Sequence, residues 1–174
     1  TNGMIYADLI FNIPELKYEE LAYTRLFTSM MTQIGSGGRD YKETLHYMEE
    51  HPGGVGASLS LPAHVHDTAA LSPYLGLRGK ALGRNVDKLF PFMYDMIHSL
   101  DVTDVPRLRE IVQKHFTGLE SSVNSYALRY ATTLAAAPFS PCARVSNHWS
   151  GLEYYHAMRD LAQNFDDRVD GMVS

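Results

Sequence analysis

Alternating apolar and polar residues predict three β-strands. Every second residue from 5 to 13 is apolar, and Pro14 closes this run, which is typical of a strand with one buried face. Residues 55–61 alternate in the same way, with glycine and serine between the apolar positions. A third run covers residues 71–82, although glycines interrupt it. The second and third runs are neighbours in the sequence and are predicted to pair antiparallel.

Apolar residues at intervals of three and four predict helices in the remaining segments. These helices are expected over residues 19–34, 40–51, 86–100, 108–134 and 152–165. The helix over 108–134 is expected to be a single long one that "APFSP" terminates. In the helix before it, four side chains are interpreted as core residues: Phe90, Phe92, Met93 and Met96. The order of elements predicts an α+β fold with helices packed on one face of an antiparallel sheet. No repeat or linker is visible, so residues 1–174 are expected to form one domain.

Composition and charge exclude several classes of function. The chain has 174 residues, 45% of them hydrophobic, which is enough to bury a core. Lys and Arg number 15 against 20 acidic residues, giving a net charge of -5. No basic field exists to hold nucleic acid or an anionic bilayer, and no apolar run approaches the roughly 20 residues of a membrane helix. Neither nucleic acid nor a membrane is therefore expected as a partner.

Cysteine usage indicates the compartment. Cys142 is the only cysteine, which excludes an intramolecular disulfide and a thiolate zinc cage. No Asn-x-Ser/Thr acceptor occurs. A reducing compartment is therefore expected. The chain opens without an initiator Met and without a basic leader pattern, so it is expected to be a piece of a longer protein.

The loop "GSGGRDY" has glycines that could expose backbone N–H groups to a phosphate. A P-loop requires Lys and then Ser or Thr after its last glycine, whereas Arg39 and Asp40 follow here. The loop is better interpreted as a corner between two helices. Gly35 would cap the first helix, and Asp40 with Glu43 would form a capping box at the start of the second.

Two groups of histidines are candidate metal sites. In "HYMEEH", His46 and His51 are five residues apart and would lie roughly 140° apart around a helix, so they cannot grip one ion together. "HVHD" places His64 and His66 on one side of an extended segment beside Asp67, without a predicted third ligand. His46 and His51 are interpreted as polar-face residues near a helix end, and His64 and His66 as solvated loop histidines. A metal-binding hydrolase that uses His64 and His66 is kept as an alternative.

Ser146, His148 and Glu153 supply the residue types of a hydrolase triad. No nucleophile elbow surrounds the serine. The three residues are therefore not expected to act together.

Longer phrases of the sequence resemble a known family. The opening "TNGMIYADLIFNIPEL", the segment "LFTSMMTQIGSGGRDYKETLHYMEEHPGGVGAS" and the late run "SSVNSYALRYATTLAAAPFSPCARVSNHWSGLEYYHAMRDLAQNFDD" are similar to the C-terminal half of presequence proteases. These enzymes are the large single-chain branch of the pitrilysin family of zinc metallopeptidases. The resemblance covers nearly the whole chain and is most specific in "GGVGAS" and "SPCARVSNHWSGLEYY".

The resemblance implies a non-catalytic role for this segment. Members of the family have four related α+β domains that close into a chamber around unfolded peptides, and zinc is bound by a His-x-x-Glu-His helix of the first domain. The present segment resembles the third domain, where residues 25–29 (Arg-Leu-Phe-Thr-Ser) stand in place of that motif and cannot bind zinc. Arg25 and Ser29 are expected to line the chamber, and no catalytic or metal-binding residue is transferred to this chain.

The same resemblance implies partners and location. The partners are other domains of the same chain and unfolded peptide substrates, and the compartment is an organelle matrix (mitochondrion or plastid) or the bacterial cytoplasm. Zinc is expected in the parent enzyme, bound by another domain. The sheet is expected to lack strands that would follow the last helix. A structural or assembly domain of the same superfamily, without proteolytic activity, remains the alternative function.

Overall fold

The computed structural model describes residues 2–14, 16–62, 66–67 and 71–173. The chain divides into two compact units that interleave in sequence. Unit 1 consists of Thr1–Asn12, Phe27–Ser60 and Tyr74–Asp104, and unit 2 consists of Ile13–Leu26, Leu61–Pro73 and Val105–Ser174. Helix α1 (Tyr18–Met30) begins in unit 2, and its last residues belong to unit 1.

Unit 1 is built on an antiparallel sheet. Its elements are β1 (Met4–Asn12), β2 (Gly35–Ser36), α2 (Tyr41–Glu50), β3 (Val55–Ser60), β4 (Tyr74–Leu82), the 3-10 turn η1 (Gly83–Asn85), α3 (Val86–His98) and β5 (Leu100–Asp101). Strand β4 lies between β1 and β3, while the short strands β2 and β5 pair separately. The α+β class and the antiparallel pairing of β3 with β4 are thus confirmed.

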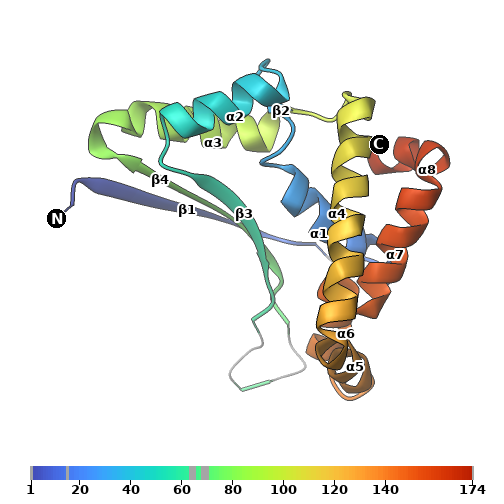
Figure 1. Cartoon of the computed structure of the whole chain (residues 1–174). Helices are drawn as coiled ribbons and strands as arrows, with labels where there is room; N and C mark the ends of the chain where they lie inside the picture. Colours follow the sequence, from blue (N-terminus) through green and yellow to red (C-terminus); the bar gives the residue numbers. More distant parts are fainter. Residues whose placement is uncertain (1, 15, 63–65, 68–70, 174) are drawn as a thin grey trace. The chain divides into compact units, whose positions relative to one another are not determined.

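Helices cover one face of this sheet. The period-2 pattern sends one set of side chains toward α2 and α3, which lie on the same side of the strands (Figure 1). There they form a core from residues of both layers: Met31, Val55, Leu77, Ala81, Leu89, Phe92, Met93 and Met96. Burying each large member of this set contributes about 1.5–3 kcal/mol.

The opposite face of the sheet carries the other alternate residues and is open. Antiparallel sheets tolerate this arrangement because only one face has to be apolar. Tyr6 and Ile10 of β1 are 65% and 62% exposed. This uncovered face is the feature of the fold that bears on function.

Unit 2 is helical. After the start of α1 it contains α4 (Val105–Ser125), α5 (Ala127–Ala136), α6 (Pro141–Ser150), α7 (Leu152–Gln163) and α8 (Phe165–Val173). Helix α4 packs beside α7 (Figure 1), and their facing sides bury Leu108, Val112, Met158 and Leu161. Among the helices in the described part of the chain, none is long and apolar enough to span a bilayer.

Three helix predictions for unit 2 need correction. The expected helix over 108–134 is two helices, because the chain leaves helical geometry at Tyr126 (φ -126°, ψ 37°). No glycine or proline marks this break, so apolar spacing alone cannot reveal it. The segment "SPCARVSNHWS", expected as a connection, is α6: Ser140 accepts a hydrogen bond from the N–H of Ala143, and Pro141 occupies the first turn. Helix α8 was not predicted from the sequence.

Two smaller predictions in unit 1 are wrong. Helix α1 ends at Met30, so Gly35 is not its cap but part of β2. Phe90 is 49% exposed and lies outside the core, while Phe92, Met93 and Met96 are buried as predicted. The capping box is confirmed: Asp40 accepts from the N–H of Glu43, and the Glu43 side chain accepts from the N–H of Asp40.

Candidate functional site

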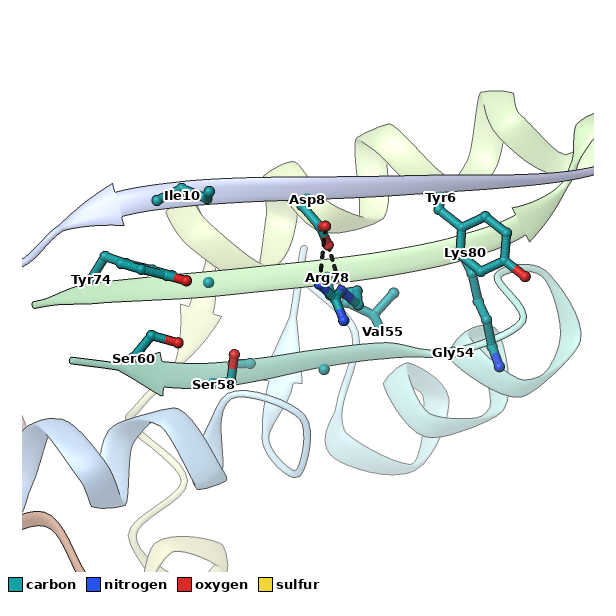
Figure 2. A pocket seen from close by; sticks show the side chains of 13 residues that line it. Tyr6, Asp8, Ile10, Gly54, Val55, Ser58, Ser60, Tyr74, Arg78 and Lys80 are labelled. Carbon is teal, nitrogen blue, oxygen red and sulfur yellow. Dashed lines mark hydrogen bonds and ion pairs between the residues drawn. The ribbon is translucent and has the colours of Figure 1, made fainter. Parts of the chain in front are cut away.

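The open face of the sheet in unit 1 carries a hollow of about 820 Å³. Three strands line it: Tyr6, Asp8 and Ile10 come from β1, Gly56, Ser58 and Ser60 from β3, and Tyr74, Gly76, Arg78 and Lys80 from β4. We call this surface the open sheet face. Figure 2 shows its side chains standing on the side of the strands away from the helices.

Strand register places these residues in rows across the sheet. Tyr6 pairs with Lys80, and Asp8 pairs with Arg78. Ile10 pairs with Gly76, which in turn pairs with Ser58 on the other side. Along the strands, these rows follow one another from a cationic end at Lys80 to an end with aromatic and hydroxyl groups at Tyr74.

Glycines make the hollow. A methyl group added at Gly56 would meet no atom within 4 Å, and one added at Gly76 would be in ordinary contact with Ser58 Oγ at 3.4 Å. Gly56 therefore lies under open space, and Gly76 has room for no more than a small side chain beside Ser58. Because neither glycine is needed for a left-handed backbone, their effect here is to leave a channel along the strands.

Arg78 and Asp8 form a fork-like ion pair across β4 and β1. Arg78 Nε donates to Asp8 Oδ1 at 2.6 Å, and Arg78 Nη2 donates to Asp8 Oδ2 at 3.1 Å (Figure 2). These hydrogen bonds lower the pKa of Asp8, and the charge of Arg78 acts in the same direction. The pair is solvent-exposed, so it orients the guanidinium toward β1 more than it stabilises the fold.

Lys80 differs from Arg78. Its backbone is held by two hydrogen bonds at the start of β3, from its N–H to Gly54 O at 3.0 Å and from Gly53 N–H to its carbonyl at 2.7 Å. Its side chain is exposed, and no ion pair joins it to an acidic group among the residues that the structure describes. The open sheet face thus carries one uncompensated positive charge in a chain of net charge -5.

This arrangement suits binding. The described residues of the lining supply a cation, hydroxyls and exposed apolar side chains. An extended chain lying along the strands would contact all of these groups. The face is therefore a candidate binding surface for an extended segment.

The candidate histidines do not assemble a metal site in the described part of the chain. His46 and His51 both approach Glu50, at 3.6 and 3.8 Å, and no group of three potential ligands occurs there. His51 ends α2, and its ring meets Tyr47 edge-on. In "HVHD", His64 lies outside the described residues, while His66 and Asp67 are exposed.

The loop "GSGGRDY" has a structural role. Gly37 and Gly38 adopt positive φ angles of 61° and 77°, which glycine tolerates best. The turn directs Arg39 to Asp95 of α3 at 2.6 Å and over the ring of Tyr47 at 4.7 Å. The loop joins α1 to α2 with β2 between them, as a corner between helices.

The hydrolase-like set is not brought together. Ser146 and His148 are two residues apart on α6, and side chains at that spacing point to different sides of a helix. His148 instead packs on Tyr18, with ring centroids 5.1 Å apart. Glu153 lies in the first turn of α7 and is exposed.

Arg25 and Ser29, the expected chamber-lining pair, lie on α1 and are half-buried. Arg25 belongs to unit 2 and Ser29 to unit 1. The Ser29 carbonyl accepts a hydrogen bond from Gln33 at 2.7 Å. The stretch from 25 to 29 offers no zinc ligand, because it has no histidine, cysteine or carboxylate.

Sequence reasoning missed a partly buried polar pair in unit 2. His115 Nε2 lies 2.6 Å from the hydroxyl of Tyr154, joining α4 to α7. Burial lowers the pKa of His115 and raises that of Tyr154, while the charge of Arg25 lowers both. His115 falls on the apolar stripe of its helix, which is a signal for burial, but its partner lies 39 residues away and only the fold identifies it.

Comparisons with known proteins agree with the sequence resemblance. The family model described as peptidase M-16C associated matches residues 1–161. The mitochondrial presequence protease of Danio rerio is 31% identical over 95% of this chain, and presequence protease 1 of Arabidopsis thaliana, chloroplastic/mitochondrial, is 22% identical over 100%. In both cases the match covers 16% of the relative's length, so the chain spans only a small part of these proteins. Because the family model matches most of its length, this chain belongs to the M-16C peptidase-associated family.

Proposed function

We propose that this chain is a non-catalytic wall segment of a zinc metallopeptidase that degrades targeting peptides and other short unfolded peptides. The observation that carries the proposal is the family match over residues 1–161, together with relatives that are named presequence proteases. The small share of their length that the chain covers favours a segment of a larger enzyme. Its partners are then the other domains of the same chain and peptide substrates.

The described residues of this segment do not fit zinc. Within the described part of the chain, no three side chains of His, Cys, Asp or Glu come together, and residues 25–29 offer no ligand. The metal and the water that it activates belong to another domain in this proposal. No step of the hydrolysis is assigned to a residue of this chain.

The open sheet face is the surface that we assign to the chamber. A chamber wall has to accept peptides of many sequences, which favours exposed contacts along an extended chain over one deep pocket. The 820 Å³ hollow, with its glycine floor and mixed lining, has this character. Arg25 and Ser29 remain further candidates for lining residues.

We place the parent protein in an organelle matrix, with the bacterial cytoplasm as the other option. Relatives in Danio rerio and Drosophila melanogaster are named as mitochondrial, and that of Arabidopsis thaliana as chloroplastic/mitochondrial. The single cysteine is compatible with a reducing compartment.

Peptide cleavage by the intact protein tests the proposal. We expect a chelator to abolish cleavage of a basic, unfolded peptide and added zinc to restore it. Replacing His46, His51, His64 and His66 together with alanine should leave zinc content and cleavage rate unchanged. The matched control is an alanine at the first histidine of a His-x-x-Glu-His motif elsewhere in the intact chain, which should remove both.

Two results would contradict the proposal. Loss of zinc from the fourfold histidine variant would place the metal in this segment. Absence of any chelator-sensitive cleavage by a correctly folded intact protein would favour a structural or assembly role without proteolysis.

A further inference from the structure

We propose that the open sheet face binds the C-terminal end of a short extended peptide, with the ammonium group of Lys80 contacting the terminal carboxylate. This inference rests on the proposed function, because it assumes that short peptides reach this face. It adds to that function the residue that makes the contact, Lys80, and the part of the peptide that is bound, its terminal carboxylate.

Charge is the first argument. Arg78 is engaged by both oxygens of Asp8, whereas the Lys80 side chain is exposed and has no acidic partner among the described residues. Two backbone hydrogen bonds with Gly53 and Gly54 fix the Lys80 backbone. The backbone of Lys80 is therefore fixed at one end of the hollow, and its ammonium group remains available to an incoming carboxylate.

Shape is the second argument. From Lys80 to Tyr74 the face extends over six residue steps of β4, or about 20 Å. An extended peptide advances by a similar distance per residue, so about six of its residues would fit along the channel. Gly56 and Gly76 leave space for its main chain and side chains between the flanking residues.

Apolar contacts are the third argument. Tyr6 lies opposite Lys80 across the strand pair, and Ile10 lies opposite Gly76. Both side chains are more than half exposed. They offer apolar surface to the last residues of a peptide whose carboxylate is at Lys80, and Figure 2 shows Tyr6 and Lys80 together at that end of the face.

A terminal carboxylate is a better match for Lys80 than an acidic side chain, because the proposed substrates differ in sequence. Peptides of unrelated sequence share only their main chain and their two termini. One cation at the end of a channel that accepts about six residues matches the feature that every such peptide carries at its end.

The test uses the intact protein with a chelator present, so that zinc-dependent cleavage does not consume the probe. The probe is a ten-residue peptide without acidic side chains, labelled with dansyl at its N-terminus and prepared as the free acid and as the C-terminal amide. Fluorescence anisotropy gives the Kd of each form. For the unaltered protein we expect the free acid to bind about three- to fivefold more tightly, the size of one exposed ion pair.

Single substitutions locate the effect. Lys80→Gln should bring the ratio of the Kd of the amide to that of the free acid close to one, while Lys42→Gln, which removes the same charge from an exposed position on α2, should leave this ratio unchanged. Asp8→Asn removes the ion-pair partner of Arg78. The freed guanidinium can then also contact a carboxylate, so the Kd of the amide relative to that of the free acid should increase. All three side chains are exposed, so the variants are expected to fold.

An unchanged ratio in Lys80→Gln, or no preference for the free acid in the unaltered protein, would overturn the inference. So would an amidated peptide with an internal glutamate that binds as tightly as the free acid, because the site would then recognise side chains. Cleavage measured separately without chelator distinguishes the two proposals: normal cleavage with an unchanged ratio leaves the proposed function intact and removes only this site.

Discussion

The three-stranded sheet of unit 1 and the helices of unit 2 place their polar groups differently, although unit 1 also buries Ser36 and Thr44 outside that sheet. In unit 1 the sheet separates them by face, with an apolar core against α2 and α3 and with Asp8, Arg78 and Lys80 on the open side. In unit 2 the helices enclose polar side chains, and the bond between His115 and Tyr154 lies between α4 and α7. Asn147, 3% exposed, is also buried there and accepts a hydrogen bond from the N–H of Leu152.

This difference teaches which changes each unit should tolerate. A strand with one buried face can vary its exposed residues without affecting the core, so a binding surface can develop there. A buried hydrogen-bonded pair cannot lose one partner without leaving the other unsatisfied. We therefore expect the three-stranded sheet of unit 1 to respond to changes in apolar volume on one face only, and the pair of α4 and α7 in unit 2 to respond to loss of its hydrogen bond and to pH.

The largest expected effect comes from the core of unit 1. Phe92 is 1% exposed and stacks on Tyr47, so Phe92→Ala should reduce the free energy of local unfolding by about 3–5 kcal/mol. Phe90→Ala on the same helix is the matched control and should cost about 1 kcal/mol or less. Hydrogen exchange of β4 and α3 amides in the intact protein measures both. Equal effects would contradict the assignment of the two faces of α3.

A pair of glycines tests the two faces of the sheet directly. A methyl group at Gly79 would lie 2.8 Å from both Leu89 Cδ1 and Met93 Sδ, so Gly79→Ala should destabilise unit 1 by about 1–3 kcal/mol. Gly56→Ala points into open space and should change stability by no more than about 0.5 kcal/mol. Hydrogen exchange of β4 distinguishes them. A large loss in Gly56→Ala would mean that another part of the protein covers the open sheet face.

The buried pair of unit 2 predicts a smaller loss. Tyr154→Phe removes the hydroxyl that meets His115 Nε2 and should cost about 1–2 kcal/mol in the local stability of α4 and α7. Tyr155→Phe is the control, because the ring of Tyr155 packs on Phe116 and no hydrogen bond to its hydroxyl is seen among the described residues. Similar losses in both variants would argue against a stabilising role for the pair.

The dependence of stability on pH that His115 causes should lie in unit 2 and should be the smallest effect. Burial lowers the pKa of His115 below 6.5, so the unfolded state binds more protons than the folded state as the pH falls below about 6.5. Exchange of α4 amides, corrected for intrinsic rates, should show stability falling below that pH until the folded pKa is reached. His115→Gln should remove this slope. A slope that persists in the variant would assign it to another group.

Sequence patterns predicted the open sheet face in part. Period-2 alternation correctly identified the three strands of this sheet, and in β4 the same alternation puts Gly76 and Arg78 on the face opposite the core-facing Leu75 and Leu77. The hollow itself could not be predicted. It depends on the register that sets Ile10 beside Gly76, and these residues come from strands that only the fold brings together.

The errors in unit 2 have a different cause. Apolar spacing detects a helix but not a break without glycine or proline, so the change of direction at Tyr126 is invisible to it. The Ser140-Pro141 pair is interpreted above as a terminator, although serine before proline is also a signal for the start of a helix. The bond between His115 and Tyr154 needs two helices at contact distance, which no local pattern encodes.

The mass of the native polypeptide tests the central claim most directly. An antibody raised against an exposed stretch of this chain, used on extracts of the cells that produce it, reports the size of the protein in which the segment occurs. We predict a band several times larger than 19.5 kDa, since the relatives that it matches are only 16% covered by this chain. A band at 19.5 kDa would contradict the account, because a self-contained protein of that size would be no wall segment of a larger peptidase chain.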